Sequence, residues 1–87
     1  MKIAAWTKPN TTETRIYFNG VYAAESEDVK VFAVARTDSK GFEIKFSGRM
    51  FPSKQDEIMN SIDFELMEMN GGERVTEFAE LLKLAGA

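Results

Sequence analysis

Hydrophobic and polar residues alternate most clearly in residues 29–48, on either side of a polar turn at residues 38–41. Side chains of a strand point alternately to its two faces, so a period of two indicates a strand that is buried on one face. In the second arm the apolar face carries Phe42, Ile44 and Phe46. The pattern predicts an antiparallel hairpin. Because two strands bury too little surface to be stable alone, further strands and a cover for this apolar face are expected.

The residues before this hairpin are rich in strand-forming side chains. Residues 2–7 predict a short first strand, and residues 14–19 predict a second one with alternating polarity. The dipeptide Asn19-Gly20 is a strong signal for a tight turn, so residues 21–24 are expected to pair back on the strand before them. Connections this short allow only antiparallel neighbours, which predicts a meander of four or five strands.

The C-terminal part has the longer period of helices. A first helix is predicted with Ser53 as its N-cap. Residues 61–69 fit the continuation of this helix but also alternate as a strand, so both readings stay open and the helix is preferred. After the break at Gly71-Gly72, residues 73–84 predict a second helix whose apolar stripe should cover the sheet. That stripe consists of Val75, Phe78, Leu81, Leu82 and Ala85.

Together these elements predict a single α+β domain over residues 1–87. It consists of an antiparallel meander sheet followed by one or two C-terminal helices packed on one face. A chain of 87 residues with 44% hydrophobic and 29% charged residues has the ordinary composition of such a domain. The sequence has no apolar run long enough to cross a membrane and no apolar segment of a secretory signal, which predicts a cytoplasmic protein without a membrane partner.

The chain contains no cysteine and no histidine. This excludes Ser-His and Cys-His catalytic arrangements and nearly all zinc and transition-metal sites. Phosphate loops, dinucleotide fingerprints and nucleophile elbows are also missing from the sequence. Carboxylate pairs such as Asp63 and Glu65 remain, but acid–base chemistry needs a pocket that perturbs a pKa, and so small a sheet leaves little room for one. The sequence therefore predicts a protein that is not an enzyme and binds no cofactor or metal.

Charge is divided unevenly, with a net +2 in residues 1–50 and −5 in residues 51–87. The acidic residues expected to contact a partner are Asp63, Glu65, Glu68, Glu73, Glu77 and Glu80. The last three are spaced i, i+4 and i+7, so they would form one ridge on the predicted second helix. Most acidic helix surfaces only stay solvated. A carboxylate ridge can also dock against a basic groove, which favours a protein partner with a basic surface.

The sheet face turned away from the helices is expected to gather aromatic and basic residues. These are Arg15, Tyr17, Lys30, Phe32, Arg36 and Lys45. Several single-stranded nucleic-acid binders use such a face to stack bases and follow phosphates. Alternatively, the same residues pack in a second layer or in a homodimer interface. Four further apolar residues fit neither pattern and are either anchors for a partner or core residues of misassigned elements. They are Trp6, Phe51, Phe64 and Met67.

In character, the chain is similar to the small modulators carried by phages and other mobile elements, such as anti-CRISPR and anti-restriction inhibitors. The likeness rests on short length, acidic charge and the lack of His, Cys and motifs. It assigns no site residues. It implies a protein-binding inhibitor or modulator that occludes a partner's surface, such as a basic nucleic-acid-binding groove. A single-stranded nucleic-acid-binding module is the second hypothesis, and a structural homo-oligomer subunit is the third.

Overall fold

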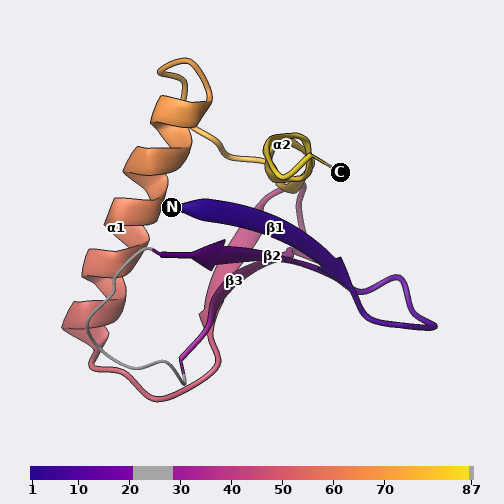
Figure 1. Cartoon of the computed structure of the whole chain (residues 1–87), viewed down its shortest axis with the longest axis horizontal. Helices are drawn as coiled ribbons and strands as arrows, with labels where there is room; N and C mark the ends of the chain where they lie inside the picture. Colours follow the sequence, from indigo (N-terminus) through magenta and orange to yellow (C-terminus); the bar gives the residue numbers. More distant parts are fainter. Residues whose placement is uncertain (21–28, 87) are drawn as a thin grey trace.

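The computed structural model describes residues 1–20 and 29–86, which form four strands followed by two helices (Figure 1). The strands are β1 (Lys2–Thr7), β2 (Thr14–Asn19), β3 (Val31–Ala35) and β4 (Phe42–Phe46). The helices are α1 (Pro52–Met69) and α2 (Phe78–Leu84). The strand predicted at residues 21–24 lies outside the described residues.

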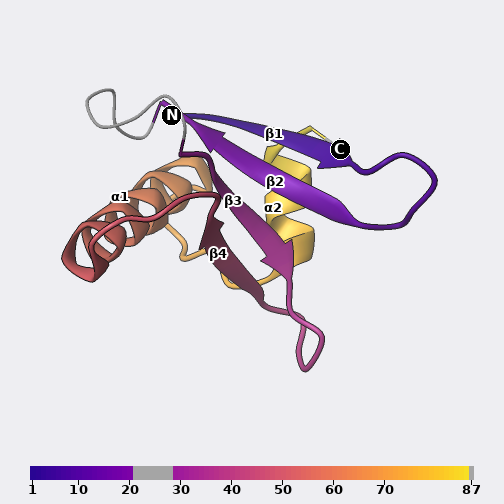
Figure 2. The ribbon, with the colours of Figure 1, turned by 90° about the horizontal axis from the view of Figure 1, so that it is seen from below.

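The sheet is an antiparallel meander in which strand order follows chain order, β1-β2-β3-β4. The β3–β4 hairpin forms as the alternation predicts, with Val31 opposite Phe46 and Ala33 opposite Ile44. In Figure 2 the strands pass in front of α2, and neither helix crosses the face of the sheet that is seen. The predicted α+β architecture is therefore confirmed, and one face of the sheet is left without helical cover.

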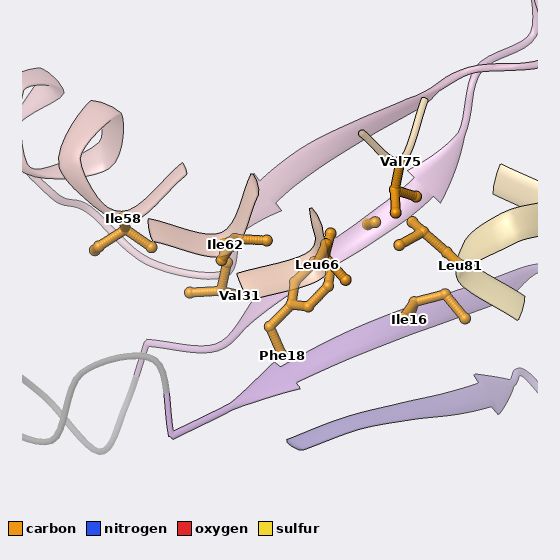
Figure 3. Packing of buried hydrophobic residues seen from close by; sticks show 9 residues of the cluster. Ile16, Phe18, Val31, Ile58, Ile62, Leu66, Val75 and Leu81 are labelled. Atoms are coloured by element: carbon orange, nitrogen blue, oxygen red, sulfur yellow. The ribbon is translucent and has the colours of Figure 1, made fainter. Parts of the chain in front are cut away.

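One hydrophobic core lies between the other face of the sheet and the two helices (Figure 3). Its buried residues are Ile16, Phe18, Val31, Ala33, Ile58, Ile62, Leu66, Val75 and Leu81. Three of them recur every four residues in α1, which places them on one side of that helix. Phe64, which a strand would bury, is 57% exposed. The helical reading of residues 61–69 is confirmed and the strand reading is wrong, because the buried positions follow the period of a helix.

The first helix begins two residues earlier than predicted. Phe51 is the N-cap of α1 and Pro52 stands in its first turn, so the prediction of Ser53 as N-cap is wrong. Proline suits this position because its fixed φ matches the helix and its missing N–H would have no partner in the first turn. Within the part of the chain that the structure describes, no helix is both long and apolar enough to cross a membrane.

The second helix is shorter than predicted, since it begins at Phe78 rather than at residue 73. Gly71 and Gly72 have positive φ angles of 67° and 90°, which ends α1 and turns the chain. Val75 is buried in the core from the connection between the helices, not from α2. Glu80 then accepts the backbone N–H of Glu77 at 3.1 Å and fixes the start of α2. Of the apolar stripe predicted for this segment, Phe78, Leu81 and Leu82 therefore lie in α2, whereas Val75 precedes it and Ala85 follows it.

Candidate functional site: the open face of the sheet

The sheet face without helical cover, here called the open face, carries two rows of side chains that cross the strands. Strand register aligns Ala4, Tyr17, Phe32 and Lys45 in one row. The neighbouring row consists of Trp6, Arg15, Val34 and Glu43. Residues in register on one face of antiparallel strands lie close enough for their side chains to touch. Three aromatic rings and one guanidinium therefore meet near the middle of the open face.

Arg15 lies between two of these rings. Its guanidinium carbon is 4.6 Å from the Phe32 ring centroid and 5.9 Å from the Trp6 ring centroid, which is cation–π geometry. Arg15 Nη1 donates to the Tyr17 hydroxyl at 3.3 Å, and Nη2 donates to Glu13 at 3.4 Å. The hydrogen bond to Tyr17 is the main cause of the raised pKa of Arg15. Arg15 is therefore held in place, and its side chain covers the ring of Phe32.

The rings contact one another as well. Tyr17 lies 5.5 Å from Phe32 at an interplanar angle of 44°, and 6.5 Å from Trp6 at 72°. These are tilted and edge-to-face arrangements, which aromatic pairs prefer. Phe32 is only 7% exposed although no helix covers it, whereas Trp6 is 44% exposed. We call Trp6, Arg15, Tyr17 and Phe32 the aromatic–arginine cluster. It is a small second core that leaves the Trp6 ring available to a partner.

A depression of about 400 Å³ adjoins this cluster at the β1 side of the sheet. It is lined by Ala4, Ala5, Trp6, Tyr17, Asn19 and Lys30. Its lining includes the small side chain of Ala4 opposite Tyr17, together with the rings of Tyr17 and Trp6. Lys30, on the same surface, is exposed. The depression therefore combines aromatic edges with a cation, and it is open to solvent.

The basic residues predicted for this face divide into two groups. Lys45 is opposite Phe32 in the register, and Lys30 lines the depression, so both belong to the surface of the cluster. Arg36 instead lies beyond β3 and forms ion pairs with Asp38 at 2.9 Å and with Glu43 at 3.4 Å. Both partners neutralise its charge. The structure therefore brings together Arg15, Tyr17, Phe32, Lys30 and Lys45, whereas Arg36 shares a depression with Lys45 but has its charge compensated by Asp38 and Glu43.

The Arg36–Asp38 pair has a direct electrostatic effect on the aspartate. Hydrogen bonding to Arg36 lowers the pKa of Asp38 below its ordinary value of 3.8. A carboxyl whose pKa is lower in the folded state stabilises that state above its ordinary pKa, and this contribution is lost as the pH falls through the lowered pKa. The pair is exposed to solvent, so its effect is confined to acid conditions and to the β3–β4 loop.

The acidic residues predicted to contact a partner are spread over separate parts of the molecule. Asp63, Glu65 and Glu68 lie on α1, whereas Glu73 and Glu77 precede α2 and only Glu80 is inside it. The predicted ridge of Glu73, Glu77 and Glu80 on one helix is therefore wrong, because the connection before Phe78 is not helical. Several of these carboxylates also have partners within the chain. Glu65 lies 3.6 Å from the Met1 ammonium.

Glu80 has a structural role in this arrangement. Its carboxylate accepts the backbone N–H groups of Thr76 and Glu77 and the side-chain amide of Asn70. We expect Glu80→Ala to lower the free energy of unfolding by about 1 kcal/mol, because helix-capping groups contribute about that much. Urea denaturation measures the change. Glu73→Ala is the matched control, since the Glu73 side chain is exposed, and equal losses for both variants would contradict the capping role of Glu80.

The carboxylate pair considered for catalysis does not converge. Asp63 lines a depression of about 400 Å³ beside β4 that also contains Arg36 and Arg74. Glu65 lies beside the Met1 ammonium instead. Among residues 1–20 and 29–86, no group of three or more His, Cys, Asp or Glu side chains could hold a metal ion. The aromatic–arginine cluster therefore remains the most organised polar and aromatic surface among the features described.

Comparisons of the chain with protein-family models, with curated proteins and with solved structures find no match. The function is therefore inferred from the surface itself.

Sequence reasoning singled out Trp6 as either an anchor for a partner or a misassigned core residue, and it did not connect Trp6 with Arg15. The signal was present in the first strand, where Lys2, Ala4 and Trp6 share one face by period-two alternation. The missing information was the register, because only the pairing of Trp6 with Arg15 across β1 and β2 brings the two side chains together.

Proposed function

We propose that this chain is a non-enzymatic protein-binding module, and that its contact surface is the open face of the sheet around Trp6, Arg15 and Tyr17. The observation that carries the proposal is the aromatic–arginine cluster, formed on a face that neither helix covers. Tryptophan, tyrosine and arginine are the residues that most often dominate the binding energy of protein interfaces. Here they are already fixed by mutual contacts, so binding would order few further side chains.

The geometry favours a protein over a single-stranded nucleic acid as partner. Bases stack on bare aromatic faces, but Arg15 and Tyr17 cover Phe32, which is 7% exposed. The charge of Arg36 is compensated by Asp38 and Glu43. The net charge of −3 also opposes the long-range attraction that phosphate backbones require. Lys30 and Lys45 suit acidic groups at the rim of a protein interface equally well.

The role proposed for this module is that of an inhibitor or modulator that occludes the surface of its partner, in keeping with the resemblance to small phage and mobile-element modulators. A basic partner would contact the acidic residues that remain exposed, such as Glu68 and Glu73. These residues lie away from the aromatic–arginine cluster along the chain. In this proposal they steer association, because exposed charges change association rates more than they change final affinity.

The test compares the wild type with Trp6→Ala in affinity capture from a host lysate treated with nuclease, followed by quantitative mass spectrometry. We expect a protein captured by the wild type to be reduced at least tenfold with Trp6→Ala, since truncating a tryptophan that anchors an interface commonly costs about 2 kcal/mol or more. Phe64→Ala is the matched control, because Phe64 is also exposed but lies on α1. Equal capture by all three proteins would contradict the proposed surface.

A titration separates the nucleic-acid hypothesis from this proposal. The chain has a single tryptophan, Trp6, so its fluorescence reports directly on the proposed surface. Stacking of a base on the indole would quench this emission when a mixed-sequence single-stranded oligonucleotide is added at low salt. The proposal expects unchanged emission. Saturable quenching that is lost at high salt would instead favour the nucleic-acid-binding module.

A further inference from the structure

β1 lies at one end of the sheet and pairs only with β2 among the described strands. Just after β1, the Lys8 N–H donates to the Glu13 carbonyl at 2.9 Å, which marks a hydrogen-bonded pair. In an antiparallel ladder such pairs alternate with non-hydrogen-bonded ones. The backbone groups of Lys2, Ala4 and Trp6 therefore point toward β2. Those of Ile3, Ala5 and Thr7 point away from the sheet and are directed at the outer edge.

This edge lacks the features that usually keep sheet edges from pairing. Edges are commonly protected by charged side chains, by proline or by bulges. At the opposite end of the sheet, β4 carries Glu43 and Lys45 among its five residues. β1 carries only one charged residue, Lys2, among its six, and it contains no proline. Five of its six residues are exposed. β1 is therefore the edge that is better suited to accept another strand.

We propose that β1 pairs, antiparallel and edge to edge, with β1 of a second copy of this chain, with Ala4 of one copy directly opposite Ala4 of the other. An added strand must keep open-face residues opposite open-face residues, because a slip of one position exchanges the two faces. Of the symmetric registers that satisfy this condition and the hydrogen-bond pattern, two pair the most residues of β1. One is centred on Ala4 and the other on Ala5.

Side-chain chemistry decides between the two registers. The register centred on Ala5 would place Lys2 opposite Lys8 of the other copy, and like charges in opposition are destabilising. The register centred on Ala4 places Lys2 opposite Trp6 of the other copy, where a lysine and an indole attract each other. It also pairs Ile3 with Ala5 through two hydrogen bonds. The two Ala4 residues would form a close non-hydrogen-bonded pair, which their small side chains permit.

Pairing in this way joins two sheets into one continuous sheet and places two aromatic–arginine clusters on the same face. Each cluster would gain Lys2 of the other copy beside its Trp6. The inference rests on the backbone of β1 and not on the proposed function, so either can fail without the other.

Cysteine crosslinking tests the register, and the natural chain has no cysteine to interfere. In an antiparallel pair with the residues directly opposite, Cα atoms lie about 4.5 to 5.5 Å apart, within the reach of a disulfide. We expect Ala4→Cys to form a disulfide-linked dimer under mild oxidation at least tenfold faster than Lys2→Cys. In the Lys2→Cys variant the two introduced thiols would be offset by about 13 Å along the strand. Faster crosslinking of Lys2→Cys or of Ala5→Cys would overturn the proposed register.

Light scattering over a concentration series tests the association itself. We expect the wild type to approach twice the chain mass of 9.8 kDa as its concentration rises. Ala5→Pro removes an N–H that points to the outer edge and spares the pairing with β2, so it should raise the dissociation constant at least tenfold while the circular dichroism is retained. If Ala5→Pro does not fold, Ala4→Lys replaces it, since it sets like charges opposite each other. A wild-type monomer at every concentration, or a folded variant that dimerises like the wild type, would overturn the proposal.

Discussion

Replacing Ile62 by alanine is expected to lower the free energy of unfolding by about 3 kcal/mol, within the range for isoleucine-to-alanine changes in protein cores. The Ile62 side chain has no exposed surface and lies in the core between α1 and the sheet, together with Val31 and Phe18 (Figure 3). The truncation leaves a cavity that neighbouring strands cannot close without moving. For a chain of 87 residues this is a large part of the whole stability. Urea denaturation followed by circular dichroism measures the change.

Phe64→Ala is the control for this measurement, because it lies on the opposite side of the same helix. Its ring is 57% exposed, so the free energy of unfolding should change by no more than about 0.5 kcal/mol. A loss at Phe64 as large as the loss at Ile62 would mean that α1 packs on the sheet through a different side.

Replacing Phe32 by alanine is expected to lower the free energy of unfolding by about 3 kcal/mol. This is near the lower end of the range for buried phenylalanines, because the side chains that pack on Phe32 are themselves in contact with solvent. Arg15 and Tyr17 lie against the ring on the open face. Its loss should free both side chains and shift the emission of Trp6, which contacts both of them. The stability change is read by urea denaturation, and the fluorescence of the folded variant reports the loosening of the cluster.

Phe51→Ala provides the comparison for Phe32→Ala. Phe51 is 82% exposed, and its truncation should change stability by no more than about 0.5 kcal/mol. If Phe32→Ala were as mild as Phe51→Ala and left the Trp6 emission unchanged, the aromatic–arginine cluster would not be a packed layer. The proposed contact surface would then lose its preorganisation.

Most of the fold follows from local patterns in the sequence. The alternation of apolar and polar residues in β4, beside the apolar β3, identified the central hairpin and the face that it buries. Residues 61–69 were ambiguous because two patterns overlap in them. Ile62, Phe64 and Leu66 alternate as in a strand, and Ile62 and Leu66 also have the spacing of one face of a helix. The packing of Ile58, Ile62 and Leu66 against the sheet resolves this ambiguity. That information is tertiary and is not contained in any short window of sequence.

The errors at the second helix have a similar origin. Val75 fits the helical stripe predicted for residues 73–84, yet it is buried from a connection that is not helical. Its position depends on the positive φ angles of Gly71 and Gly72 and on the hydrogen bond from Phe78 N–H to the Lys40 carbonyl at 3.0 Å. For the candidate surface, the sequence predicted which residues of β2, β3 and β4 share a face, but not which of them touch. The stacking of Arg15 between two rings could not be predicted, because it depends on the register between β1, β2 and β3.

During synthesis all four strands leave the ribosome before the helices that cover them. Each strand pairs with its neighbour along the chain, so the sheet can form as soon as residue 46 is free. Until α1 and α2 follow, Ile16, Phe18 and Val31 face solvent on the side that the finished protein buries. We expect chains interrupted before α1 to aggregate or to be held by chaperones, because exposed apolar strands are the usual starting point of both. Efficient production of this protein therefore depends on uninterrupted translation through residues 52–84, which contain both helices.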